Sequence, residues 1–341
     1  MNKPDPLQGK DLKLYYRLIA LWVIVEGMLG GLIHGLKLPV SGLVVGGAAV
    51  CCISMIAWHT QSRKAILQAT IIVAIFKMML SPHSPPPAYI AVFFQGWMGA
   101  LLFSGRKHFA LSCVLLGVIA LFESAIQRIL VLTIIYGVAF WETIDIFVSK
   151  VTGAEEVTPF SKILAIAYIL MHIVAGWIIG IIANRMVKFV FLKPRNLQEE
   201  LITENALTTE EIELPKKKKS RFPFKKSLLV IWIFLVVLFV QSFLFPDDPW
   251  ISTGSVGMIL LRSFLIILSW YFLLRPLFQY ILRRYLSKQS GKYKEIIEEI
   301  QALLPALRQI WISSWQHSRH LSGMRRWKMF VSSVLLRSLY E

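Results

Sequence analysis

Two apolar runs on either side of a proline-rich turn constrain the fold of this chain more than any other feature. The runs, 65–80 and 90–103, are each roughly long enough to cross a hydrocarbon core of about 30 Å. The turn between them, SPHSPPPAY, contains four prolines: Pro82, Pro85, Pro86 and Pro87. Proline lacks an N–H and restricts the residue before it, so neither helix can continue through this turn. The stretch therefore predicts a hairpin of two membrane-crossing helices.

Further apolar runs of at least this length are separated by polar, basic or proline-containing turns. They cover 18–36, 40–58, 109–135, 163–187, 228–244 and 255–274. Hydrophobic residues make up 56% of the 341-residue chain, whereas a soluble domain usually has about 45–50%. The sequence therefore predicts an all-α, polytopic transmembrane helix bundle with eight crossings.

The order of these runs divides the chain into four predicted domains. They are a six-helix membrane domain that binds substrate (1–192), a cytoplasmic charged linker (193–226), a two-helix transmembrane hairpin (227–282) and a cytoplasmic basic amphipathic tail (283–341). Within the first domain, residues 141–160 form a polar outer segment. The dipeptide Arg275-Pro276 is expected to end the last crossing and open the tail.

The positions of lysine and arginine predict the orientation of the chain in the membrane. Cytoplasmic connections of membrane proteins carry an excess of these residues. Only Lys37, Lys150 and Lys162 fall in the expected outer turns, whereas the linker contains the run Lys216–Lys219. We therefore expect a multi-pass protein of the cell (inner, cytoplasmic) membrane with both termini in the cytoplasm. These basic connections account for the net charge of +17 without a nucleic-acid partner.

A few polar side chains interrupt the apolar runs and form the candidate substrate-binding set. They are Glu26, Lys77, Gln95, Glu123, Gln127, Arg128 and His172. Ionisable groups at membrane depth are costly and usually face a protein interior or a wet cavity. With His34 and His83 at the outer helix ends, they could line an outward-facing pocket. Three alternatives remain open: Lys77 extends to the membrane interface, the charges only hold helices together, and His172 is a packing residue.

Small residues at four-residue spacing indicate where helices approach one another closely. Gly27, Gly31 and Gly35 form such a face on the first helix, and this face could pack within the bundle or against another subunit. The pairs Gly42 and Gly46, and Gly176 and Gly180, are similar.

Motifs of common enzyme and cofactor sites are absent from the sequence. It has no HExxH, GxSxG, CxxC or nucleotide-binding loop. The three cysteines, Cys51, Cys52 and Cys113, lie in apolar runs and imply no disulfide framework and no metal site. We therefore expect no enzyme, no cofactor and no metal, and any uphill transport requires an ion gradient or a partner ATPase.

The tail carries two apolar stripes with helical spacing. The first runs from Glu295 to Trp311 and is expected to weaken at Pro305. The second consists of Trp327, Val331, Val334 and Leu335, with basic residues beside it. Such helices could lie on an anionic membrane surface, occupy a groove of a cytoplasmic partner, or be solvated. Glu295, Glu298 and Glu299 beside the first stripe favour the protein partner.

The first 190 or so residues resemble the substrate-binding S component of energy-coupling factor transporters. The resemblance rests on six helices within this length, on the outer turn HGLKLPVSG before VVGGAAV, and on SPHSPPPAYIAVFFQGWMGALLF. It implies that a vitamin or metal is captured in an outward-facing cavity, and that a T-like membrane subunit with two cytoplasmic ABC ATPases drives its release. Gly27, Gly31 and Gly35 stand where the family has an alanine pair.

Three functions follow from these features. The first is a substrate-binding subunit of an uptake system for a small, vitamin-like molecule. The second is a membrane scaffold that recruits cytoplasmic partners through its tail. The third is an intramembrane enzyme that uses the charged residues.

Overall fold

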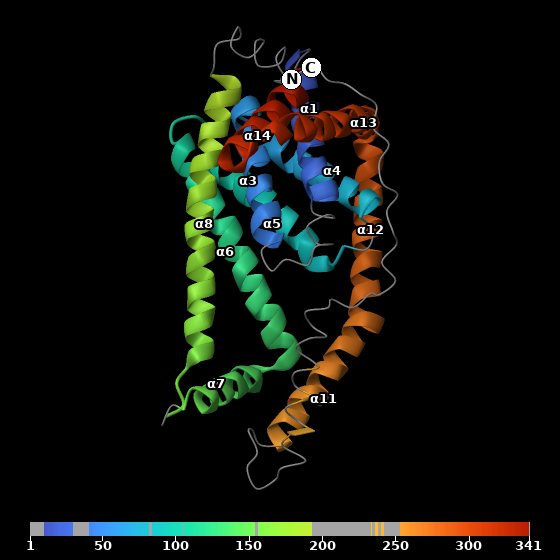
Figure 1. Ribbon diagram of the computed structural model, residues 1–341. Coiled ribbons are helices and arrows are strands. Elements are labelled where there is room, and N and C mark those ends of the chain that lie inside the picture. The colour runs from blue at the N-terminus through green and yellow to red at the C-terminus, as the bar shows by residue number, and fades with distance from the viewer. Residues whose placement is uncertain are drawn as a thin grey trace. The chain divides into compact units, whose positions relative to one another are not determined.

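The computed structural model is helical throughout the part of the chain that it describes (Figure 1). The described residues are 10–29, 41–81, 84–103, 105–153, 156–192, 233, 236–237, 240–241 and 253–340. Among them no strand occurs, which confirms the all-α class. Four described helices are long and apolar enough to cross a membrane, namely Gly42–Thr60, Phe109–Tyr136, Phe160–Phe191 and Gly257–Lys292. These four helices are compatible with a membrane protein, while the count of eight crossings stays a prediction.

Contacts within the chain divide it into two compact units. The first comprises Met1–Leu121, Ile173–Glu213 and Ile281–Glu341, and the second comprises Phe122–His172 and Leu214–Tyr280. The boundaries of the four predicted domains concern membrane and cytoplasm, which these units do not test, so they stay predictions. The predicted linker and most of the predicted crossing 228–244 lie outside the described residues, as do Gly31, Gly35, His34 and His83.

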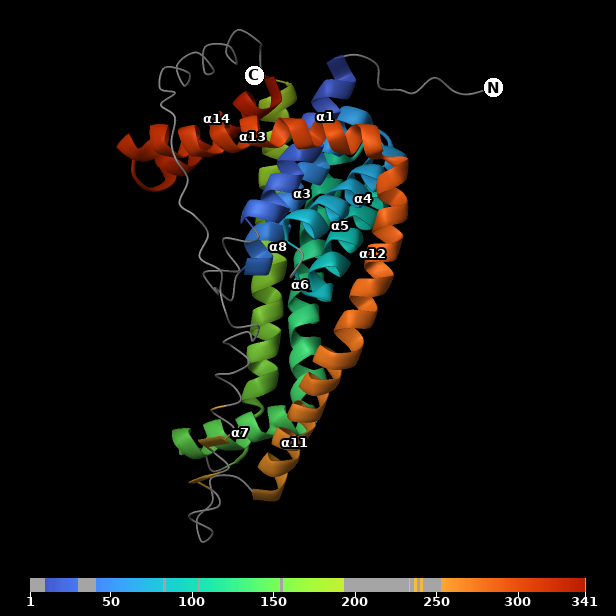
Figure 2. The same ribbon diagram turned by 90° about the vertical axis from the view of Figure 1, so that its right-hand side faces the viewer.

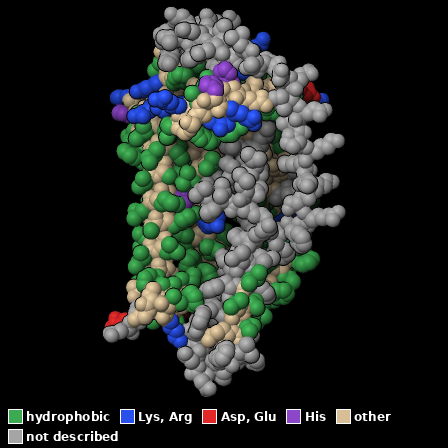
Figure 3. Space-filling model, viewed as in Figure 1, with side chains coloured by type: hydrophobic (Ala, Val, Ile, Leu, Met, Phe, Trp, Pro, Cys, Tyr) green, Lys and Arg blue, Asp and Glu red, His purple; other side chains and the backbone are tan. Residues whose placement is uncertain are grey.

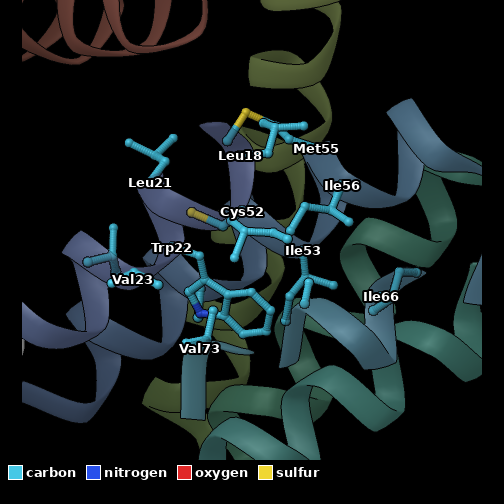
Figure 4. Close-up of a cluster of buried hydrophobic side chains, with 14 of the residues drawn as sticks. Leu18, Leu21, Trp22, Val23, Cys52, Ile53, Met55, Ile56, Ile66 and Val73 are labelled. Atoms are coloured by element: carbon cyan, nitrogen blue, oxygen red, sulfur yellow. The ribbon is translucent and has the colours of Figure 1, made fainter. Parts of the chain in front are cut away.

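Helix α1 (Lys10–Ile24) lies at the centre of the first unit. It contacts α3 (Ser41–Thr60), α4 (Arg63–Leu80), α13 (Lys294–His317) and α14 (Gly323–Tyr340). Figure 4 shows Trp22 of α1 among Ile53 of α3 and Val73 of α4, and all three side chains are buried. From Leu18 onward α1 is apolar on all sides, and a helix of this kind is expected inside a bundle.

The predicted hairpin around the proline turn is present as α4 and α5 (Pro86–Leu102), which pack against each other. Ser62 caps α4 by accepting a hydrogen bond from the Ala65 N–H, and Pro86 starts α5 at a position where no N–H is needed. The turn therefore separates the two helices as expected. Their passage through the membrane stays a prediction.

Glycines join α6 (Phe109–Tyr136) to α8 (Phe160–Phe191) within the first unit. A Cβ added to Gly176 would lie 2.5 Å from the Gly117 carbonyl oxygen, and one added to Gly180 would meet the backbone of Val114. The two backbones therefore touch at a place where no side chain fits. The close approach predicted at Gly176 and Gly180 is confirmed, and Gly117 is the partner that the sequence did not reveal.

The segment 141–160, predicted to be polar and outer, contains a helix that was not predicted, α7 (Val138–Thr152), and its place outside the membrane stays a prediction. Phe140, Ile144 and Phe147 recur at helical spacing among the polar residues and provide an apolar face. The helix ends at Gly153, whose φ of 68° suits a left-handed C-cap. Asp145 then caps the start of α8 by accepting hydrogen bonds from the Ser161 N–H at 2.6 Å and hydroxyl at 2.9 Å.

The helix end predicted at Arg275-Pro276 is wrong. Helix α11 (Thr253–Ser269) continues through the π-helical turn η2 (Trp270–Leu274) into α12 (Arg275–Lys292). The Arg275 N–H donates to the Trp270 carbonyl, five residues back, so the hydrogen-bond register has already shifted before the proline. Pro276 is therefore tolerated inside a long helix.

The tail helices cover the end of α1 (Figure 2). Ile297, Ile300 and Leu307 of α13 are buried in the same hydrophobic core as α1, and Val334 and Leu335 of α14 join it. Helix α13 runs through Pro305 without ending there, and the weakening expected at this proline stays a prediction. Much of the first apolar stripe is thus already covered by the chain itself.

Candidate functional site

A buried ion pair joins two of the predicted site residues. Lys77 Nζ lies 2.5 Å from Glu26 Oε2, and the side chains are only 7% and 3% exposed. The two residues are 51 positions apart and come from α4 and from η1 (Val25–Leu29), the π-helical continuation of α1. Lys77 therefore points into the bundle, where its ammonium group is buried and paired.

The local structure around Glu26 explains how the pair forms. A π-helical turn adds a residue to the helical register and reorients the side chains that follow, and such turns are frequent at functional sites. Gly27 lies directly against Leu80 at the end of α4, where an added Cβ would come within 2.9 Å of Leu80 Cδ1. This contact holds η1 close to the last turn of α4, from which Lys77 extends.

Of the seven described polar side chains in the first unit that have a buried atom without a hydrogen-bond partner, five are on the tail helices α13 and α14, and two are on helices of the bundle around the ion pair. These two are the Gln95 carbonyl oxygen, on α5, and the Trp22 indole N–H, on α1. A buried polar group without a partner costs free energy, and native proteins contain few of them. Together they offer one acceptor and one donor in the helix bundle that also contains the Glu26–Lys77 pair.

The other predicted site residues belong to the second unit. Glu123 has a buried carboxylate oxygen without a hydrogen-bond partner. Gln127 follows one helical turn later, and Arg128 lies within electrostatic range of Tyr168. His172 is 1% exposed, donates from Nδ1 to the Tyr168 carbonyl at 2.9 Å and packs on the Tyr168 ring, which supports the packing interpretation.

The structure therefore brings Glu26 and Lys77 into contact and places Gln95 in the same compact unit. Glu123, Gln127, Arg128 and His172 are in the other unit. The predicted substrate-binding role of the whole set stays a prediction.

Sequence reasoning missed two polar groups. Trp22 lies within an apolar run and does not stand out there, although its indole N–H needs a partner when buried. Arg262 interrupts the apolar run of α11, and its guanidinium packs over Gly137, where an added Cβ would lie 3.1 Å from Nη1. A lone arginine in such a run is a signal that the sequence does contain.

Within the described ranges, no group of three or more His, Cys, Asp or Glu side chains is placed to hold a metal ion. Cys51, Cys52 and Cys113 are free thiols, and all three are buried. Comparison with protein-family models, with curated proteins and with solved structures finds no match for this chain.

Proposed function

We propose that this protein is the substrate-binding membrane subunit of an uptake system, and that it captures a polar small molecule beside Glu26 and Lys77. The observation that carries the proposal is their ion pair, which is buried among apolar helices. Burial of a charge costs roughly several kcal/mol per ion, and the attraction between the two ions offsets this cost only in part. A function beyond helix packing therefore explains why the pair is present.

Two groups without a hydrogen-bond partner, on α5 and α1 of the same unit, indicate the chemistry of the ligand. Gln95 Oε1 needs a donor and Trp22 Nε1 needs an acceptor. A compact molecule with donors and acceptors on one heteroaromatic or polar frame meets both requirements, and vitamin-like compounds have this character. The sequence resemblance to transporter S components points to the same class.

The direction and energy of uptake are part of the proposal. The protein crosses the inner membrane eight times with both termini in the cytoplasm, and the ligand site opens outward. Since the sequence contains no nucleotide-binding loop, energy comes from partners, namely a T-like membrane subunit and cytoplasmic ABC ATPases.

Reporter fusions test the orientation. Fusions after residues 62, 105, 215 and 300 should report the cytoplasm, and those near 86, 152 and 248 the outside. An outside signal from the run Lys216–Lys219 would contradict the orientation, because this run is its strongest determinant.

A double substitution separates ligand binding from helix packing. Glu26→Gln with Lys77→Met removes both charges and leaves no unpaired ion, so the protein should insert and remain folded. If the pair binds substrate, uptake per folded molecule falls at least tenfold, and a ligand found by native mass spectrometry on the wild-type protein is lost. Lys64→Met, an exposed lysine at the other end of α4, is the matched control. Unchanged uptake and unchanged ligand in the double variant would reject the site and favour the scaffold.

A further inference from the structure

Helices α13 and α14 form a hairpin whose turn is built differently from its base. The base is covered by α1, whereas large apolar side chains are exposed toward the turn at η3 (Ser318–His320). Met324 is 71% exposed and Trp327 is 56% exposed, and Trp315 is also exposed. Exposed tryptophan and methionine at one place indicate a contact surface.

The charge around these side chains has a single sign. From Gln301 to Tyr340 the sequence contains no Asp or Glu. Four basic residues on this stretch are exposed: Arg308, Arg319, Arg325 and Lys328. Figure 3 shows lysine and arginine side chains gathered along α13 and α14. The surface therefore suits an anionic partner.

The hairpin is a preformed surface, because aromatic contacts join its two helices. Trp315 packs on Trp327 and on Phe330 with ring centroids 5.9 and 5.3 Å apart. The Arg326 guanidinium lies 4.3 Å from the centre of the Trp315 ring. Nearer the end of α14, Arg337 donates to the Ser313 hydroxyl at 3.0 Å.

The place of the hairpin within the first unit decides between the possible partners. Figure 2 shows α13 and α14 across the end of α1, with their turn projecting to one side of α1. In a membrane protein, a hairpin that projects sideways from the end of the bundle meets the headgroup region of the neighbouring bilayer. Tryptophan and arginine are well suited to this region, since each has an apolar body and a polar end.

We propose that the turn of the α13–α14 hairpin binds the anionic phospholipid surface beside the bundle, with Met324 and Trp327 inserted among the headgroups and Arg325 and Lys328 contacting phosphates. Basic residues act on such a surface only within about a Debye length, about 10 Å at ~0.1 M salt. Trp327 and Lys328 are adjacent and Arg325 is two residues away, so insertion and attraction act together.

A spin label at Met324→Cys in the otherwise complete, purified protein tests the proposal. The protein is reconstituted in nanodiscs of phosphatidylcholine alone or of equal parts phosphatidylcholine and phosphatidylglycerol. The three native cysteines are buried, and the unsubstituted protein gives the background labelling. In the anionic nanodiscs, the ratio of oxygen to aqueous nickel-complex accessibility should rise several-fold, and high salt should reduce it.

Substitutions then locate the effect. Arg325→Gln with Lys328→Gln should abolish the rise, whereas Arg284→Gln with Lys288→Gln, an equal charge change at exposed positions of α12, should leave it unchanged. Trp327→Ser should reduce the rise in the anionic nanodiscs. A label that remains accessible to the aqueous nickel complex in both lipid compositions would overturn the proposal and assign this surface to a soluble acidic partner.

Discussion

The two compact units treat a glutamate within an apolar run in opposite ways. In the first unit, Glu26 is paired with Lys77 inside a packed core. In the second, Glu123 keeps one buried oxygen without a partner. Both residues occupy apolar helices and look alike in the sequence. The difference teaches that a charge in an apolar run becomes structural only when another helix brings its counter-charge.

Packing around the two glutamates differs in the same direction. In an apolar window of 18 residues within α3, which packs against η1, 67% of the residues are buried, compared with 39% in such a window of α6, the helix that carries Glu123. The Glu26 pair is therefore enclosed by protein, whereas the helix of Glu123 has more exposed surface. We expect substitutions at the pair to affect stability most and those at Glu123 to affect it least.

The largest expected effect is that of Lys77→Met alone. It leaves the Glu26 carboxylate buried without its counter-charge, which typically costs about 3–5 kcal/mol. Thermal unfolding in detergent should show a clear loss, and the double variant with Glu26→Gln should recover most of it. Lys64→Met is the control and should have no effect. If the single variant were as stable as wild type, the pair would not be a structural element and the comparison would fail.

A second, intermediate effect is expected at the contact between α6 and α8. Gly176→Ala places a methyl group against the Gly117 carbonyl oxygen, so the helices must separate, at a typical cost of about 1–3 kcal/mol. The same change at Gly291, a helical position with no atom within 4 Å of an added Cβ, should be neutral or slightly stabilising. Thermal melting of both variants measures the difference, and equal melting temperatures would contradict the close approach.

Local sequence signals predicted the helices well where one residue decides the outcome. The proline-rich turn separates α4 from α5 as predicted, and Pro86 starts α5. Prediction failed where a neighbouring segment decides. The π-helical turn η2 lets Pro276 continue a helix, and the apolar face of α7 is diluted by Glu142 and Asp145.

The candidate site shows the same division. The polar residues in the apolar runs could be identified from the sequence, because their cost in a membrane marks each one. Their pairing could not, since Glu26 and Glu123 were both available to Lys77 and Arg128. The pair joins two residues that are 51 positions apart and lie on different helices. The Trp22 indole N–H lacks a partner because the side chain is fully buried, and the sequence does not show this burial.

The smallest effect on stability is expected for Glu123→Gln, and here uptake is the informative measurement. The Oε2 atom of Glu123 has no partner to lose, so the melting temperature should change by less than the equivalent of about 1 kcal/mol. Glu142→Gln makes the same chemical change on an exposed face of α7 and is the control for both measurements. If Glu123 contributes to ligand binding, uptake falls in the Glu123 variant and not in the control. A loss of stability with unchanged uptake per folded molecule would instead show that Glu123 holds helices together, and would remove it from the candidate site.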